Sequence, residues 1–265
     1  MTVLFESGYV TDNYPLTHAR IAHDNNWIAS DTITASTTAT DYFAEGPDNS
    51  LTYEKWKPSS LPATWENDFS SSNAVDYCVI AAHNMGTNGN SLQVQRYDSA
   101  SYTDMIPTTA ITDDSPIFVI FTSTADTRYR IRISNGTAPE IGVIKFGVAL
   151  QMPRPIYGGH SPVDLARETI LQANISETGE FLGRTKKRHA LTAQFDWQHI
   201  GADWVRDNWV DFQKATETAP FVIAWRPSSF GEVHLVQATQ TPTADNMGIR
   251  NLMTLSATGR ARGYD

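Results

Sequence analysis

Histidine and carboxylate side chains are the groups most able to do chemistry in this chain, and the spacing of the histidines indicates no metal site. Seven histidines are scattered along the 265 residues. The closest pair, His18 and His23, lies five residues apart, which is a poor spacing for ligands of one metal ion. We therefore interpret both as ordinary surface or interface histidines and expect no bound metal.

Carboxylates offer no better case for catalysis. A glycosidase needs two facing carboxyl groups, but a chain with 29 acidic residues always supplies pairs. Glu140, between Pro139 and Ile141, is a natural nominee, although a carboxylate making backbone contacts ahead of a strand is the favoured interpretation. The sequence also lacks a G-x-S-x-G nucleophile elbow, a phosphate-binding glycine loop and an H-E-x-x-H pair. We predict that the protein is not an enzyme and needs no cofactor.

Charge and cysteine content narrow the possible partners. The formal net charge of -9 argues against a groove for nucleic-acid backbone, yet it permits a channel through which DNA passes unbound. The single cysteine, Cys78, excludes an intramolecular disulfide and suits folding in a reducing cytoplasm. The first nine residues lack the pattern of a signal peptide. No run of about 18 apolar residues occurs, so we expect no membrane insertion.

Functional side chains must be positioned mainly by β-strands, because the sequence is rich in aromatic, threonine and turn-forming residues. In the first half, short alternating or apolar runs recur at regular spacing with turn residues between them. This pattern is typical of a sandwich or jelly roll. The expected strands occupy residues 30–40, 75–82, 91–97, 116–121, 129–133 and 142–150.

A proline- and glycine-rich stretch divides the chain. Residues 151–162 contain three prolines and two glycines, a density that forbids regular structure. We predict two domains, residues 1–151 and residues 152–265, joined by an ordered arm that contacts a neighbouring subunit. The residues of this inter-subunit arm are Pro153, Arg154, Pro155, Ile156, Tyr157, Gly158, Gly159 and His160.

The second domain is predicted to be a β-sandwich flanked by one α-helix. The helix is expected at residues 203–216, where large apolar side chains recur at helical spacing and Asp203 is a good N-cap. The expected strands occupy residues 191–197, 221–226, 232–238 and 251–257. The predicted fold class is therefore mainly β, with an N-terminal jelly-roll sandwich and a C-terminal helix-flanked sandwich.

Some side chains have the chemistry of a sugar-binding loop. Aromatic residues at loop tips stack on sugar rings, and nearby amides bind hydroxyl groups. Tyr42 and Asn84 are the candidate glycan-binding residues, with a plain surface or subunit contact as the alternative. Trp56 and Trp65 are assigned to the core. The basic run at residues 185–189 is interpreted as a solvated loop, or alternatively as a contact with an acidic neighbouring subunit.

The order of motifs in residues 25–150 resembles a discoidin-like jelly roll of the coagulation factor 5/8 type C family. The more specific motifs are RYRIRI at residues 128–133 and EIGVIKFG at residues 140–147. The cysteines that tie the ends of many secreted members are absent here. Loops at one end of that barrel often bind glycans or lipid headgroups, which the resemblance implies for Tyr42 and Asn84.

The whole chain also looks like phage tail proteins of the distal-tail or minor-tail type from long non-contractile tails. The phrases that carry this resemblance are at residues 15–28, 153–162, 181–184 and 220–227. It implies a homo-oligomeric ring, most simply a hexamer, around the DNA channel. It also implies contacts with tail tube, hub and fibre proteins, assembly in the host cytoplasm, and a final place at the virion tail tip.

Three functional hypotheses follow, and the first is preferred. The protein is a structural component of the phage distal tail, at the baseplate or tail tip, that forms a ring and attaches tip or fibre proteins. The alternative is a carbohydrate-binding host-surface adhesin module. A glycan-cleaving enzyme with an attached binding module is the third. A closed ring in solution would favour the first, and glycan binding by a monomer would favour the second.

Overall fold

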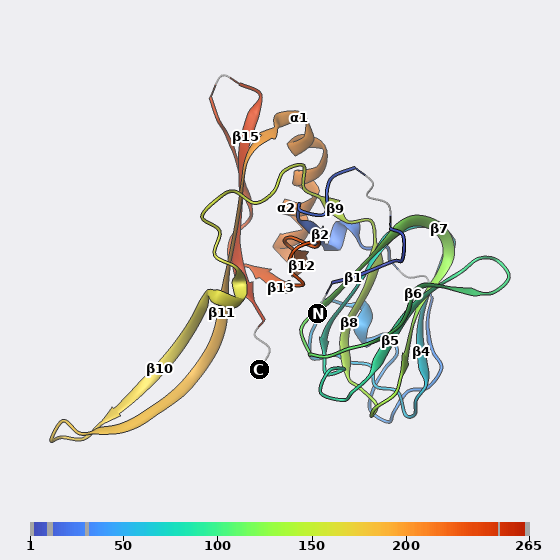
Figure 1. The fold of residues 1–265 in the computed structure, drawn as a ribbon, viewed down its shortest axis with the longest axis horizontal. Coiled ribbons are helices and arrows are strands. Elements are labelled where there is room, and N and C mark those ends of the chain that lie inside the picture. The colour runs from blue at the N-terminus through green and yellow to red at the C-terminus, as the bar shows by residue number, and fades with distance from the viewer. Residues whose placement is uncertain (1–2, 10–12, 30–31, 249, 263–265) are drawn as a thin grey trace.

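Strands account for most of the regular structure of the protein (Figure 1). The computed structural model describes residues 3–9, 13–29, 32–248 and 250–262, and for residues 167–170 and 186–190 it describes the backbone. It contains an N-terminal jelly roll and a C-terminal sheet flanked by one helical segment. The predicted mainly β fold class is confirmed.

The jelly roll has seven strands in the order β3-β4-β7-β5-β6, with β1 paired to β7 and β8 paired to β4. Its strands are β1 (Val3–Phe5), β3 (Thr32–Ala35), β4 (Ala63–His83), β5 (Ser91–Tyr97), β6 (Tyr102–Ala110), β7 (Ile117–Ser134) and β8 (Ile141–Gly147). Strand β4 serves both layers of the roll: its residues 65–68 pair with β3, and its residues 77–83 pair with β8. Strand β7 pairs with β4 along both parts. Their mutual register shifts between Asp68 and Asn73, where one layer gives way to the other.

The core of the jelly roll lies between these two layers. Alternating residues such as Trp65, Ile80 and Ile131 are fully buried in it. The strand predicted at residues 91–97 is confirmed as β5. The strands predicted at 116–121 and 129–133 are the two ends of β7, because the polar segment between them also pairs with β4.

The C-terminal sheet has eight strands in the order β10-β11-β15-β13-β12-β2-β9, with β14 paired to β15. Its strands are β2 (Arg20–Ala22), β9 (Leu150–Gln151), β10 (Arg167–Ile175), β11 (Phe181–Gly201), β12 (Phe221–Ala224), β13 (Val233–Ala238), β14 (Thr243–Asn246) and β15 (Leu252–Ala261). Strand β2, from the beginning of the chain, is hydrogen-bonded between β12 and β9. The predicted first domain, residues 1–151, therefore contributes two strands to this sheet.

One helical segment covers a face of the C-terminal sheet, as predicted. It comprises α1 (Ala202–Trp204), a π-helical turn η4 (Val205–Trp209) and α2 (Val210–Thr218). Its N-cap is Gly201 rather than the predicted Asp203. Asp203 lies in the first turn instead, where a carboxylate favours the positive end of the helix dipole. The short 3-10 helices are η1 (Asp24–Asn26), η2 (Gly46–Asp48) and η3 (Val163–Leu165).

The sheet is buried on both faces near β12. On one face Phe221 and Ile223 pack with the helix in one apolar cluster. On the other, Val222 and Ala224 pack against Val79 and neighbouring residues of β4, β7 and β8. This alternation along β12 explains why its sequence is continuously apolar. The two halves of the protein thus share an apolar layer.

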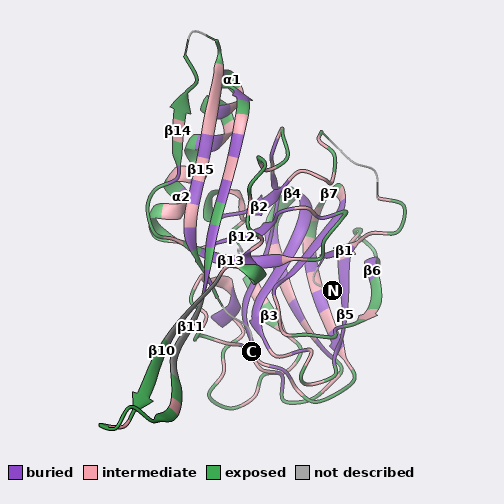
Figure 2. Ribbon diagram, turned by 60° about the vertical axis from the view of Figure 1, so that its left-hand side comes forward, coloured by how far each residue is buried: buried purple, intermediate pink, exposed green. Residues whose placement is uncertain are grey.

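Strands β10 and β11 extend beyond the rest of the sheet as a long hairpin (Figures 1 and 2). Nine residue pairs join the two strands, which corresponds to a length of roughly 30 Å. Among its described side chains, the large apolar ones in solvent are Leu171, Ile175, Phe181 and Leu182, each at least 50% exposed. Figure 2 shows the end of the hairpin as mostly exposed. We call these two strands and their turn the hairpin arm.

None of the described helical segments has the length and apolar character needed to cross a membrane.

Candidate functional site

Two buried tryptophans fix the loop that forms one wall of the candidate site. Trp56 and Trp65 are fully buried, which confirms their assignment to the core. The Trp56 Nε1 donates to the Thr37 carbonyl at 3.1 Å, and the Trp65 Nε1 donates to the Ala44 carbonyl at 2.7 Å. A buried indole N–H is stabilised by such an acceptor. These two hydrogen bonds hold the loop between Thr37 and Ala44, which carries Tyr42, at the surface of the jelly roll.

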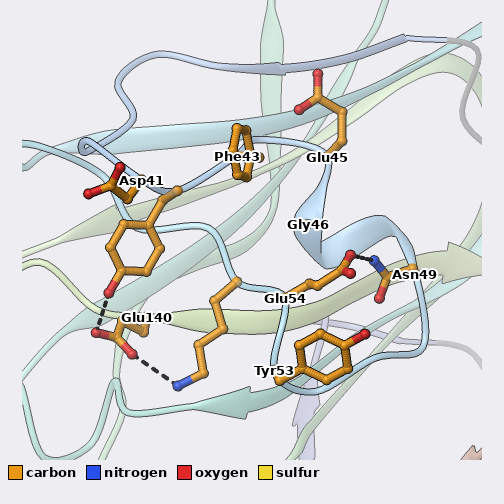
Figure 3. Close-up of a pocket in the computed structure, with 10 residues that line it drawn as sticks. Asp41, Phe43, Glu45, Gly46, Asn49, Tyr53, Glu54 and Glu140 are labelled. Carbon is orange, nitrogen blue, oxygen red and sulfur yellow. Dashed lines mark hydrogen bonds and ion pairs between the residues drawn. The ribbon is translucent and has the colours of Figure 1, made fainter.

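This loop borders an open pocket of about 700 Å³ (Figure 3). Two aromatic rings beside it lie largely in solvent, since Phe43 is 70% exposed and Tyr53 is 73% exposed. Carboxylate, amide and ammonium groups line the same pocket. The pocket is lined by Asp41, Tyr42, Phe43, Glu45, Gly46, Asn49, Tyr53, Glu54, Lys55 and Glu140.

The Glu140 carboxylate, which lines the pocket, binds three neighbouring side chains. Its Oε1 accepts a hydrogen bond from the Tyr42 hydroxyl at 2.8 Å and lies 3.3 Å from the Lys57 Nζ. Its Oε2 lies 2.9 Å from the Lys55 Nζ. The interpretation of Glu140 as a carboxylate that makes backbone contacts is therefore wrong. Its side chain ties three others together.

These contacts stabilise the charged form of Glu140. Hydrogen bonds from Lys55 and then Tyr42 lower the pKa of Glu140 to about 2, against the smaller opposing effect of desolvation. The same hydrogen bond raises the pKa of Tyr42, because the tyrosine hydroxyl must keep its proton to donate it. At neutral pH Glu140 therefore carries its charge and Tyr42 keeps its hydroxyl proton, so both groups are fixed in the pocket.

Asn84, the second predicted glycan-binding residue, contacts the backbone of Glu140. Its Oδ1 accepts a hydrogen bond from the backbone N–H of Glu140 at 2.7 Å and lies 3.3 Å from the Asn88 Nδ2. Asn84 is not among the lining residues. The structure therefore brings Tyr42 and Asn84 to the same residue: Tyr42 lines the pocket and binds the Glu140 carboxylate, and Asn84 holds the Glu140 backbone.

Sequence reasoning missed Tyr53, Lys55 and Lys57, although a signal for the two lysines exists. They flank Trp56, and alternation along an extended segment places both on the side opposite a buried residue. Trp56 pairs with Ile141 through two backbone hydrogen bonds of 2.9 Å. Both ammonium groups are thereby brought next to the residue that precedes Ile141.

The predicted inter-subunit arm lies against its own chain. The backbone N–H of Tyr157 donates to the Asp196 carbonyl at 2.8 Å. The His160 Nδ1 lies 3.0 Å from the Gln194 carbonyl oxygen, and its ring stacks 5.5 Å from Phe195. These contacts place the arm along β11. Contact of the same residues with a neighbouring subunit stays a prediction.

The two histidines considered as metal ligands have separate surroundings. The His18 Nδ1 lies 3.0 Å from the Met152 carbonyl oxygen. His23 is buried with its ring 5.5 Å from Phe212, and desolvation lowers the pKa of His23 to about 4. His23 is therefore an interior residue between the start of the chain and the helix. In the described ranges, no three His, Cys, Asp or Glu side chains are grouped so as to hold a metal ion.

The basic run at residues 185–189 is part of strand β11. Thr185 pairs with Gln172 and His189 pairs with Thr169 of β10, so its interpretation as a loop is wrong. The side chains of residues 186–189 lie outside the described residues.

No protein-family model matches this sequence, and no curated protein matches it with significance. Among solved structures, a chitosan-binding module from a chitosanase/glucanase of Paenibacillus sp. IK-5 is similar at 17% identity and a TM-score of 0.39, over 48% of this chain and 99% of that module. A pectin-binding carbohydrate-binding module is similar at 10% identity and a TM-score of 0.40, over 44% of this chain and 89% of that one. A family 32 carbohydrate-binding module from C. perfringens, solved with galactose, is similar at 13% identity and a TM-score of 0.39, over 43% and 91%. Similarities at this level carry no function to this chain.

Proposed function

We propose that this protein binds carbohydrate through the jelly-roll pocket. The observation that carries the proposal is the placement of two solvent-exposed rings, Phe43 and Tyr53, beside the ordered Glu140 network. Sugars present apolar C–H faces and hydroxyl edges, so a site for them combines aromatic faces with fixed polar groups. The role is binding without catalysis.

The fixed geometry of the polar groups supports the same proposal. Tyr42, Lys55 and Lys57 are held by one carboxylate, so little side-chain freedom is lost when a hydroxyl group binds them. The pocket volume of about 700 Å³ lies within the range of small-molecule sites. An open pocket of this size accommodates a terminal sugar of a longer chain.

Replacing Phe43 by alanine is expected to weaken carbohydrate binding about tenfold (~1.4 kcal/mol), because one stacking face is lost. A glycan array selects the ligand, and calorimetric titration measures the affinity. The matched control is Phe181→Ala, since Phe181 is a phenylalanine of similar exposure on the hairpin arm. Absence of any array signal from the intact chain would reject the proposed function.

A second candidate function is supported by the hairpin arm: a structural subunit of a phage distal tail that assembles into a ring. Among its described side chains the arm carries four large apolar ones that are exposed, and its outer strand β10 is the edge strand of its sheet. Exposed apolar edge strands favour pairing with another chain. A second copy in a closed ring is the simplest partner. Under this proposal the ring lies at the tail tip of the virion and contacts the tail tube, hub and fibre proteins. DNA passes through the ring without being bound.

Replacing Phe181 and Leu182 together by alanine is expected to weaken self-association at least tenfold, because both side chains are more than 60% exposed and would be covered in an assembly. Sedimentation velocity measures the oligomer distribution. Phe43→Ala serves as the reciprocal control and should leave that distribution unchanged. A monomeric intact chain at high protein concentration would contradict the ring.

A further inference from the structure

A second hollow adjoins the jelly-roll pocket. It has a volume of about 580 Å³ and lies between the loop at residues 50–53 and strands β13 and β15 of the C-terminal sheet. Tyr53 lines both hollows. Tyr53 is 73% exposed, so its ring separates the two hollows and remains accessible to a ligand. The two hollows are therefore contiguous across one aromatic side chain.

The second hollow is basic where the first is acidic. Arg260 and Arg262 line the second hollow, and both are exposed. The first is lined by Asp41, Glu45 and other carboxylates. The contrast holds although the whole chain carries a net charge of -9. A ligand that spans both hollows meets opposite charges at its two ends.

The strand register places Arg260 toward the jelly roll. Arg260 pairs with Gln237, and Leu235, two residues before Gln237, packs on the jelly roll. Residues two apart share one face of a strand, so Gln237 and Arg260 lie on the same side as Leu235. The Arg260 guanidinium has no hydrogen bond or ion pair within the part of the chain that the structure describes. It is available to an anionic ligand.

We propose that the two hollows form one site for an acidic oligosaccharide that lies across Tyr53. An uncharged sugar occupies the jelly-roll pocket, and a residue bearing a carboxylate, sulfate or phosphate group lies over Arg260. Carboxylates of the first pocket repel an anion there, whereas a guanidinium binds one with two parallel hydrogen bonds. The charges of the two hollows thereby fix the direction in which the oligosaccharide binds. This inference rests on the proposed carbohydrate-binding function.

The test uses the full chain and a glycan array of two- to six-residue oligosaccharides. Each uronic-acid oligosaccharide is printed beside its carboxyl-reduced form, which keeps the backbone and removes the charge. We expect the best acidic ligand to have at least three residues and to bind about tenfold tighter than its reduced form (~1.4 kcal/mol). Arg260→Gln should abolish that difference and leave binding of the reduced form unchanged. Arg260→Glu should make the acidic form the weaker ligand.

Matched variants separate the two hollows. Arg250→Gln, an exposed arginine near the opposite end of β15, should behave as the intact chain. Tyr53→Ala should weaken both forms of the ligand, because the shared ring is lost. Equal binding of the acidic and reduced forms, insensitive to Arg260→Gln, overturns the inference and leaves the proposed function intact. No binding of any oligosaccharide overturns the proposed function itself.

Discussion

Replacing Trp209 by alanine is expected to lower the free energy of unfolding by about 3–5 kcal/mol, the cost typical of deleting a fully buried tryptophan. Trp209 is 0% exposed, and its ring lies 5.7 Å from that of Trp197 and 4.8 Å from that of Phe212. These three rings join the helix to the sheet, so the cavity left by the substitution opens at the centre of the C-terminal core. Urea denaturation followed by circular dichroism measures the loss.

Val210→Ala is the control for this substitution. Val210 follows Trp209 in the same helical segment, but its side chain is 37% exposed. Its replacement should cost less than about 1 kcal/mol. Equal losses for the two variants would contradict the packing of the helix on the sheet through Trp209.

Replacing Glu140 by alanine is expected to weaken carbohydrate binding about a hundredfold (~2.7 kcal/mol). The substitution releases Tyr42, Lys55 and Lys57 together and leaves two ammonium groups without their carboxylate. Titration calorimetry with the selected ligand measures the effect, with Glu217→Ala, on an exposed turn of the helix, as the control. Unchanged affinity would show that the network is not part of the ligand site.

The same network makes a prediction about pH. The pKa of Glu140 in the folded protein, about 2, lies below its usual value of 4.5. A group with a lowered folded pKa contributes stability above its unfolded pKa, and that contribution is lost as the pH falls toward the folded value. The network should therefore be intact at pH 5 and lost toward pH 2. A carboxyl ¹³C resonance of Glu140 that titrates near 4.5 would contradict the observed contacts.

The pattern of apolar and polar residues along the sequence was sufficient to predict several strands and the helix. The sequence of strand β5 alternates between polar and apolar residues and lies between turn residues, so both its existence and its bounds were predictable. The helix was predictable because large apolar residues recur on one stripe, and three of them, Val205, Trp209 and Phe212, are buried in the cluster shared with the sheet. Both patterns depend on neighbours in sequence. Neither requires knowledge of which strand pairs with which.

Long-range pairing set the limit of sequence reasoning. Strand β2 has three residues, and its place between β12 and β9 depends on partners far along the chain. Strand β10 has exposed side chains at Leu171 and Ile175. Its sequence therefore lacks the alternation of apolar and polar residues that a half-buried strand shows. The basic run at residues 185–189 is a strand because β10 pairs with it. Its charges alone indicated a loop.

The candidate site was predictable only in part for a similar reason. Tyr42 was identified from its residue type in a loop, and it does line the pocket. Glu140 could not be distinguished among 29 acidic residues, because its importance depends on lysines about 85 positions away in the sequence. Tyr53 acquires its role from two hollows, one of which includes residues of the C-terminal sheet. That juxtaposition exists only in three dimensions.

The apolar layer shared by the jelly roll and the C-terminal sheet has a consequence for avidity. Because Val222 and Ala224 are packed on the jelly roll, the pocket cannot turn freely relative to the hairpin arm. If arms join copies of the chain, every pocket in the assembly points in a fixed direction. Binding at one pocket then raises the effective concentration of a repeated ligand at the next pocket. The avidity of the assembly therefore exceeds the affinity of a single pocket. Loosening this layer would reduce attachment without changing any residue that touches the ligand.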